Sequence, residues 1–165
     1  MEDRCQIVVG VIPQQNDRVV SSVKRLARAL QADVVFVYAD AHGYQGAAGH
    51  ASSLDPDLVN GGFADNEIRE GLEARLGRGM EDSDSVWKLV CCRGSAGQAL
   101  AQIAQEVDAE LIVIGDREEG PKAVMRETVG GKVASILVRI QPRPVVIVPQ
   151  HPKLSDREDA GVCSR

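Results

Sequence analysis

The sequence is poor in aromatic residues, which make up 3% of its 165 residues. Its core must therefore be built mainly from aliphatic side chains, and few rings are available to stack on nucleic-acid bases. An excess of positive charge is also missing, because the formal net charge at pH 7 is -5. Nucleic-acid-binding domains normally carry a basic patch or stripe. We therefore expect no nucleic acid among the partners.

Long apolar segments are missing as well. No run approaches the roughly 18 apolar residues that a membrane-spanning helix requires. The first residues, Met1 to Arg4, lack the basic-then-apolar layout of a signal peptide. The length and these features predict a single domain in the cytoplasm, without a membrane partner.

Metal, redox and catalytic motifs are also absent from the sequence. Its 4 cysteines include no C-x-x-C pair. Cys91 and Cys92 are adjacent, so a strand would point them to opposite faces, and we interpret both as small buried apolar residues. His42 and His50 lack H-x-x-x-H spacing and predict no metal site. No catalytic triad or acid–base pair is visible in the sequence. Ser95 is better explained as a helix cap than as a nucleophile, with Gln98 as its capping-box partner.

What the sequence does contain is a regular alternation between short apolar runs and helical patterns. Runs typical of buried strands occupy 7–11, 34–38, 86–92, 111–114 and 145–148. Helical spacing separates them, over 19–30, 65–80, 95–107 and 133–140. This order predicts an α/β fold with a doubly wound, five-stranded parallel sheet and helices on both faces.

The same pattern predicts the domain organisation. Residues 1–149 form one α/β domain that contains a long, glycine-rich loop over 41–62. Residues 150–165 are polar, and we expect them to form a flexible C-terminal tail.

A doubly wound sheet binds ligands at the carboxyl ends of its strands, near the point where the strand order reverses. Ile12 and Ala39 lie at the ends of the first two runs, and the segment from Gly115 to Lys132 follows the fourth. Glycine N–H groups between a strand and a helix can cradle a phosphate. The segment is not a P-loop, because Pro-Lys follows Gly120 where Lys-Ser or Lys-Thr is required.

Three segments resemble the universal stress protein family, in the family's order and spacing. Residues 94–100 and 109–115 are similar to its G-x5-L and ADLIVVG segments, and 142–149 match its closing P-x-P-V-x-V-V-P strand. The opening strand and helix also look like those of the family. The resemblance covers the chain to about Pro149. It implies a 3-2-1-4-5 strand order, a homodimer and a role in stress adaptation.

The resemblance also implies a nucleotide site. Family members that bind ATP carry G-x2-G-x9-G-S/T after the fourth strand and an Asp after the first, where this chain has Ile12. With Gly115 as the first glycine, Glu118 takes the second position and the third comes late. With Gly120 as the second glycine and Gly130 as the third, Gly131 stands where the motif requires Ser or Thr. With Gly131 as the third glycine, Lys132 takes that position. The candidate nucleotide-binding positions are Ile12, Ala39, Gly115, Arg117, Gly120, Gly130, Gly131 and Lys132.

Negative charge around these glycines disfavours a triphosphate. Asp116, Glu118 and Glu119 would stand beside it, and two like charges about 4 Å apart repel by about 4 kcal/mol at an effective dielectric of about 20. Four basic residues of the same segment, or Mg2+, could compensate: Arg117, Lys122, Arg126 and Lys132. The segment is therefore either a phosphate cradle or a structural connector.

Two main functions are compatible with these features. One is a non-enzymatic, dimeric stress-response module whose nucleotide binding is weakened or absent. The other is an ATP-binding stress sensor, with or without slow hydrolysis, that uses residues 115–132. A third, a nucleotide-dependent transferase, would need a phosphate loop after the first strand, where residues 12–15 contain no glycine. In the family's strand order, Val145 to Val148 form an apolar sheet edge, and pairing of this edge with its twin predicts the homodimer.

Overall fold

The computed structural model describes residues 4–14, 17–40, 66–116 and 129–150. The elements are β1 (Gln6–Gly10), α1 (Asp17–Leu30), β2 (Asp33–Asp40), α2 (Asn66–Met80), β3 (Trp87–Arg93), α3 (Ala96–Glu106), β4 (Leu111–Asp116), α4 (Val129–Ile140) and β5 (Val145–Pro149). Within the described ranges, no helix has the length and hydropathy needed to cross a membrane. The predicted loop at 41–62 and residues 151–165 of the predicted tail lie outside the described residues.

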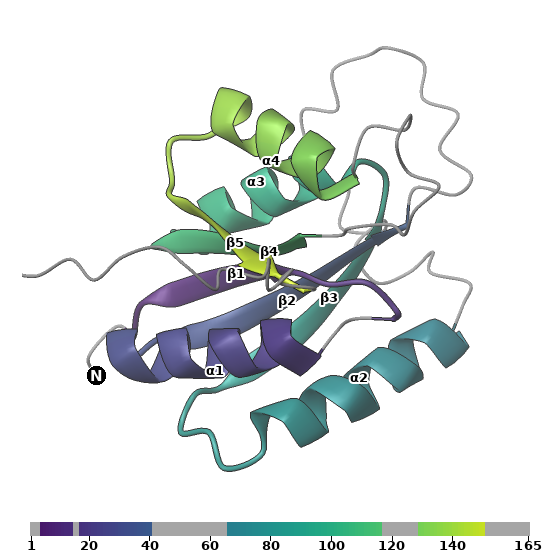
Figure 1. Ribbon diagram of the computed structural model, residues 1–165, viewed down its shortest axis with the longest axis vertical. Helices are drawn as coiled ribbons and strands as arrows, with labels where there is room; N and C mark the ends of the chain where they lie inside the picture. The colour runs from purple at the N-terminus through teal and green to yellow at the C-terminus, as the bar shows by residue number, and fades with distance from the viewer. Residues whose placement is uncertain (1–3, 15–16, 41–65, 117–128, 151–165) are drawn as a thin grey trace, which may run out of the picture.

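The strands form one five-stranded sheet in the order β3-β2-β1-β4-β5, and every neighbouring pair is parallel. This confirms both the predicted fold class and the strand order that the resemblance implied. Helices α1 and α2 lie on one face of the sheet, and α3 and α4 cover the other (Figure 1). The strand order reverses around β1, which has β2 on one side and β4 on the other.

Side-chain alternation along the strands divides the core into two layers. Ile7 and Val9 of β1 pack with the residues of α1 and α2, whereas Val8 packs with those of α3. Cys91 and Cys92 divide in the same way, one in each layer, and both are buried and free of disulfides. The prediction that these cysteines are apolar core residues on opposite faces is therefore confirmed.

Two glycines allow the helices on each face to approach closely. A Cβ atom on Gly79 of α2 would overlap the side chain of Val20 in α1. On the other face, a Cβ atom on Gly97 of α3 would lie 2.6 Å from the Cγ2 atom of Ile136 in α4. Real Cβ atoms essentially never come this close to another heavy atom, so each helix pair depends on a glycine at its contact.

Two local expectations, the Ser95 capping box and the assignment of Gln150 to the tail, were wrong. Ser95 occupies the N-cap of α3 with an extended backbone, but its side chain makes no capping hydrogen bond, so the capping box with Gln98 does not form. Helix α4 begins at Val129, so Gly130 and Gly131 lie in its first turn, ahead of the apolar positions that indicated this helix in the sequence. Gln150 was assigned to the flexible tail, yet its exposed fraction is 8%.

Candidate functional site

The carboxyl ends of β1, β2 and β4 meet at the reversal point of the sheet. After β1 ends, the chain continues along β2, because the Val11 N–H donates a hydrogen bond to the Val37 carbonyl oxygen at 2.9 Å. Ile12 follows directly, while Ala39 lies near the end of β2 and Gly115 near the end of β4. Three of the predicted positions therefore come to one edge of the sheet, where doubly wound proteins bind their ligands.

The side chains at this edge offer a nucleotide few polar contacts. Ile12 and Ala39 are apolar and partly buried, and Gly115 has no side chain. The ionisable residues at the same strand ends are Asp40 in β2 and Asp116 in β4, both partly exposed. In the described part of this edge, a ligand would meet apolar surface, backbone and carboxylates.

The first turn of α4 provides the opposite kind of surface. Gly130, Gly131 and Lys132 all lie in this turn, whose N–H groups have no partner within the helix and carry partial positive charge. The turn contains no acidic residue, and Lys132 is exposed. Because α4 returns the chain from the carboxyl end of β4, its first turn lies toward the same edge. This part of the predicted segment can hold an anion, whereas Arg117 and Gly120 lie outside the described residues.

Contacts from other elements fix the backbone around the edge. Arg75 of α2 donates from Nη1 to the Pro13 carbonyl oxygen at 3.3 Å, which ties α2 to the chain after β1. Gly94 has a φ of 122° and donates its N–H to the Asp40 carbonyl oxygen at 2.9 Å. Sequence reasoning missed Arg75, because an arginine on the polar face of a helix carries no signal of the carbonyl that it contacts.

The cysteines of β3 are not nucleophiles at neutral pH. Burial raises the pKa of the Cys92 thiol to about 11. Burial also raises the pKa of Cys91, against an opposing effect of the Arg69 guanidinium. The thiolate is the nucleophilic form of cysteine, so both side chains stay neutral. Nor do the described residues include a group of three or more His, Cys, Asp or Glu side chains that could hold a metal ion.

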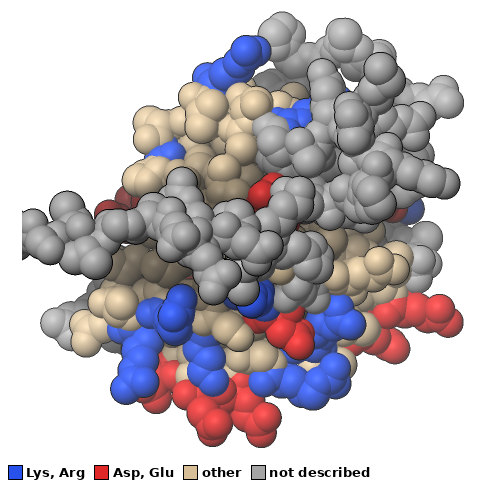
Figure 2. All heavy atoms as spheres, in the orientation of Figure 1, with Lys and Arg blue, Asp and Glu red and all other residues tan. Residues whose placement is uncertain are grey.

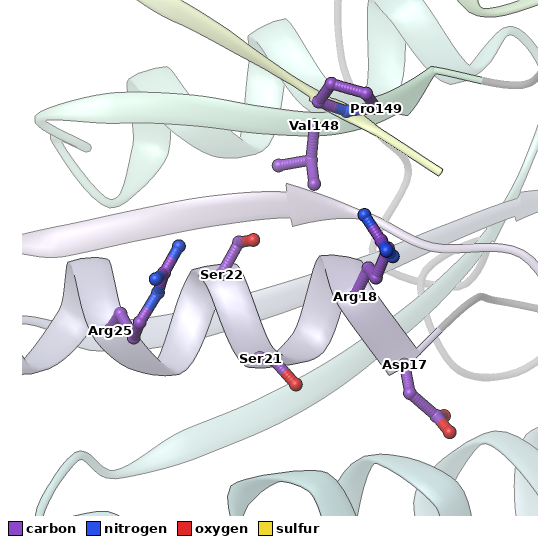
Figure 3. Close-up of a pocket in the computed structure, with 7 residues that line it drawn as sticks. All are labelled: Asp17, Arg18, Ser21, Ser22, Arg25, Val148 and Pro149. Atoms are coloured by element: carbon purple, nitrogen blue, oxygen red, sulfur yellow. The ribbon is translucent and has the colours of Figure 1, made fainter. Parts of the chain in front are cut away.

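A second feature, which sequence reasoning missed, is a groove between α1 and the edge strand β5. Its volume is about 510 Å³, and its β5 side consists of Val148 and Pro149 (Figure 3). Its only sequence signal is the set of polar residues Arg18, Ser22 and Arg25, which recur on one face of α1. Over the wider face shown in Figure 2, basic and acidic side chains gather together around α1 and α2.

The fold, with its reversal point at β1 and a glycine-containing helix start after β4, defines a doubly wound α/β protein. The model of the Universal stress protein family matches residues 5–149, so the chain belongs to this family. The family inferred from the three sequence segments is thereby confirmed.

Solved structures of universal stress proteins share this fold. One, determined in complex with cAMP, has 20% identity and a TM-score of 0.59, and the match covers 90% of this chain and 98% of that one. Another, from Archaeoglobus fulgidus in complex with dAMP, has 19% identity and a TM-score of 0.56 over 87% and 97% of the two chains. UspA from Lactobacillus plantarum has 19% identity and a TM-score of 0.58 over 88% and 97%. No match was found among curated proteins.

Proposed function

We propose that this chain is a non-enzymatic, dimeric stress-response protein in which the nucleotide site of the family is weakened. The observation that carries the proposal is Ile12, a partly buried apolar residue at the place where ATP-binding members have an Asp. A carboxylate there could accept hydrogen bonds from a nucleotide, whereas an isoleucine side chain can accept none. Asp40 and Asp116 add negative charge at the neighbouring strand ends, which opposes a bound polyphosphate.

The chemistry at the strand ends supports a role without catalysis. Residues 12–14, 39–40 and 115–116 include no hydroxyl, thiol or imidazole group. The buried thiols of β3 have raised pKa values and stay protonated. A protein with these groups can still act through binding and through its surfaces.

The second candidate function is an adenine-nucleotide sensor. It is favoured by the first turn of α4, where Gly130, Gly131 and Lys132 combine N–H groups that have no partner within the helix with a positive side chain. The structures solved with cAMP and dAMP share the fold of this chain. An adenosine monophosphate has fewer negative charges than ATP, so it would suffer less repulsion from the carboxylates at the edge.

The two functions are separated by calorimetry with ATP and Mg2+, AMP, cAMP and dAMP. We expect weak or undetectable ATP binding by the unmodified chain. Ile12→Asp restores an acceptor, and a charged hydrogen bond contributes about 1.5–3 kcal/mol, so binding is expected to tighten by about tenfold or more. The matched control is Gln14→Asp, which adds the same charge two residues away on an exposed position. Micromolar ATP binding by the unmodified chain, abolished by Gly131→Trp, would instead establish the sensor.

A homodimer through β5 is the remaining part of the proposal. The sheet has two edges, and β3 carries the exposed charged residues Lys88 and Arg93, which discourage strand pairing. The β5 edge has no charged residue, and Ile147 is 50% exposed. Val138 of α4, the helix that covers β5, is 67% exposed. Pairing of two β5 strands across a two-fold axis would satisfy the backbone of this edge and cover Ile147.

A further inference from the structure

Helix α2 contains three glycines, and the packing of the described residues requires one of them. A Cβ atom on Gly79 would overlap Val20 of α1, so this glycine permits the contact between the two helices. A Cβ atom on Gly71 would meet no heavy atom of the described residues outside the helix's own backbone within 4 Å. On Gly77 it would lie 3.8 Å from Trp87 Cζ2, which is an ordinary van der Waals contact. Gly71 and Gly77 therefore weaken the helix without serving a close approach.

The effect of such glycines on helix stability is large enough to matter. An internal glycine disfavours a helix by about fivefold relative to alanine, which corresponds to about 1 kcal/mol. The cause is the backbone freedom that glycine loses when the helix forms. Isolated helices as short as the 15 residues of α2 are marginal in water even with favourable residues. Helix α2 therefore depends on its packing against the rest of the protein.

That packing is limited. Of the 15 residues of α2, three are buried, whereas α3 buries six of its 11 residues. The buried residues of α2 are Leu72, Leu76 and Met80. Regions with few buried apolar side chains open locally at a smaller cost in free energy than unfolding of the whole chain. We therefore expect α2 to open more readily than α3.

The polar contacts of α2 add little to this packing. Arg75 donates to the Pro13 carbonyl oxygen, and Lys24 of α1 donates to the carbonyl oxygen of Glu81, directly after the helix. Both hydrogen bonds are exposed, so they can be exchanged for bonds to water at little net cost. The ion pair between Arg69 and Glu73 lies within α2 and does not attach it to another element.

Cys91 lies beneath α2, on the face of the sheet that α1 and α2 cover (Figure 1). Its exposed fraction is 1%, and it belongs to the core layer that contains the buried residues of α2. Burial raises the pKa of its thiol, the Arg69 guanidinium lowers it, and the Glu73 carboxylate raises it, so both α2 side chains act on this thiol. Cys92 is 0% exposed and belongs to the other layer, with the apolar residues of α3. Opening of α2 would therefore uncover one of two adjacent thiols.

We propose that α2 unfolds locally while the sheet and α3 stay folded, and that this opening makes Cys91 a reversible modification site for small disulfides. In the open state the Cys91 thiol gives its proton to the solvent, and the thiolate attacks one sulfur of the disulfide. A new S–S bond joins Cys91 to one half of the disulfide, the original S–S bond breaks, and the other half leaves as a thiolate. The closed core has no room for the attached group, so the adduct keeps α2 open until an external thiol reverses the exchange.

This proposal is independent of the nucleotide function. The glycines of α2 and Cys91 are not among the candidate nucleotide positions, which come from β1, β2, β4 and residues 115–132. Failure of nucleotide binding therefore leaves the opening of α2 untouched.

The test measures the reaction of each thiol with dithiodipyridine, a neutral disulfide, in the full chain carrying Cys5→Ser and Cys163→Ser. These two substitutions leave Cys91 and Cys92 as the only thiols. Adding Cys92→Ala isolates Cys91, and adding Cys91→Ala isolates Cys92. We expect Cys91 to react about tenfold faster than Cys92 or more, and with a weaker dependence on urea, because local opening exposes less surface than global unfolding.

Glycine substitutions in the two layers separate local from global opening. Gly71→Ala strengthens α2 and is expected to slow the reaction of Cys91 by about fivefold. The matched control is Gly97→Ala, the same substitution in α3, where the added Cβ would lie 2.6 Å from Ile136 Cγ2. Its clash is present whether α2 is closed or open, so the rate at Cys91 is expected to stay within about twofold, while Cys92 reacts faster.

Three results would overturn the proposal. The first is equal rates at Cys91 and Cys92, and the second is no reaction of Cys91 in the absence of urea. The third is equal acceleration of both thiols by Gly97→Ala, because both would then react only through global unfolding. Hydrogen exchange of the Cys91 adduct is expected to be faster in α2 and unchanged in α3, and unchanged exchange in α2 would show that the adduct does not hold the helix open. Thermal unfolding of each variant shows that the fold is retained.

Discussion

Gly97 of α3 and Ile136 of α4 lie in direct contact, with no room for a methyl group between them. A Cβ atom at position 97 would be 2.6 Å from Ile136 Cγ2 and 2.9 Å from its Cβ. The second of these atoms belongs to the rigid base of a β-branched side chain, so a rotamer change cannot remove the clash. The helices themselves would have to separate.

Gly97→Ala is therefore expected to destabilise the protein, although alanine is the better helix former. Overpacking a tight contact costs about 1–3 kcal/mol, which exceeds the gain of about 1 kcal/mol from helix propensity. The matched control is Gly71→Ala in α2, where no heavy atom of the described residues outside the helix's own backbone lies within 4 Å of the added Cβ. Urea unfolding is expected to show a lower midpoint for Gly97→Ala and a higher one for Gly71→Ala. A higher midpoint for both would show that the α3–α4 contact adapts easily.

Arg143 connects the start of β5 to the turn before β4. Its Nε donates to the Ala109 carbonyl oxygen at 2.7 Å, and its Nη2 donates to Asp108 Oδ1 at 2.9 Å. Ala109 is buried, so Arg143→Ala is expected to cost about 1–3 kcal/mol by leaving its carbonyl unsatisfied. Asp108→Asn removes only the exposed ion pair and keeps a residue that tolerates the positive φ of 48°. Urea unfolding is expected to separate the two variants, and equal losses would assign the effect to the ion pair.

Ile147 is the residue whose substitution tests the proposed dimer. Ile147→Asp places a charge at the centre of the β5 edge, and its twin would lie nearby across the two-fold axis, so the dimer is expected to dissociate. Val86→Asp is the matched control, because Val86 is also exposed, at 68%, but lies beside the opposite edge strand β3. Sedimentation equilibrium at micromolar concentration measures both. A monomeric unmodified chain, or a dimer that survives Ile147→Asp, would rule out this interface.

The buried thiol of Cys92 predicts a loss of stability at alkaline pH. Its folded-state pKa is raised from 9.0 to about 11, so the folded chain retains the proton after the unfolded chain has released it. Stability from this group is therefore complete below about pH 9 and falls as the pH rises toward 11. Cys92→Ala is expected to flatten the dependence of the unfolding free energy on pH in that range, even though its absolute stability is lower. An unchanged slope between pH 9 and pH 11 would contradict the shift.

Hydrophobic patterns along the sequence were sufficient to predict an element where burial on both faces of the sheet dictates the residue type. The run Val34 to Tyr38 is apolar at every position, because β2 lies inside a parallel sheet covered on both sides. The adjacent cysteines could be assigned to opposite layers for the same reason, since alternation needs no knowledge of partners. The strand order came from the resemblance to a family, because periodicity does not say which strands become neighbours.

Sequence patterns could not predict a contact where the partner of a residue lies far away along the chain. The polar side chains of Arg18, Ser22 and Arg25 have the spacing of any solvated helix face, and only the position of β5 beside α1 makes them one wall of a groove. Likewise, the contact of Arg75 with Pro13 depends on how α2 packs beside the end of β1.

By itself, the sequence determined the class of fold, the family and the apolar character of Ile12, since these depend on residue types and their order along the chain. The tertiary structure alone decided that Gly97 must be a glycine, that Arg143 holds the start of β5, and that Cys91 lies beneath α2. Those properties depend on distances between segments, which hydrophobic periodicity does not encode.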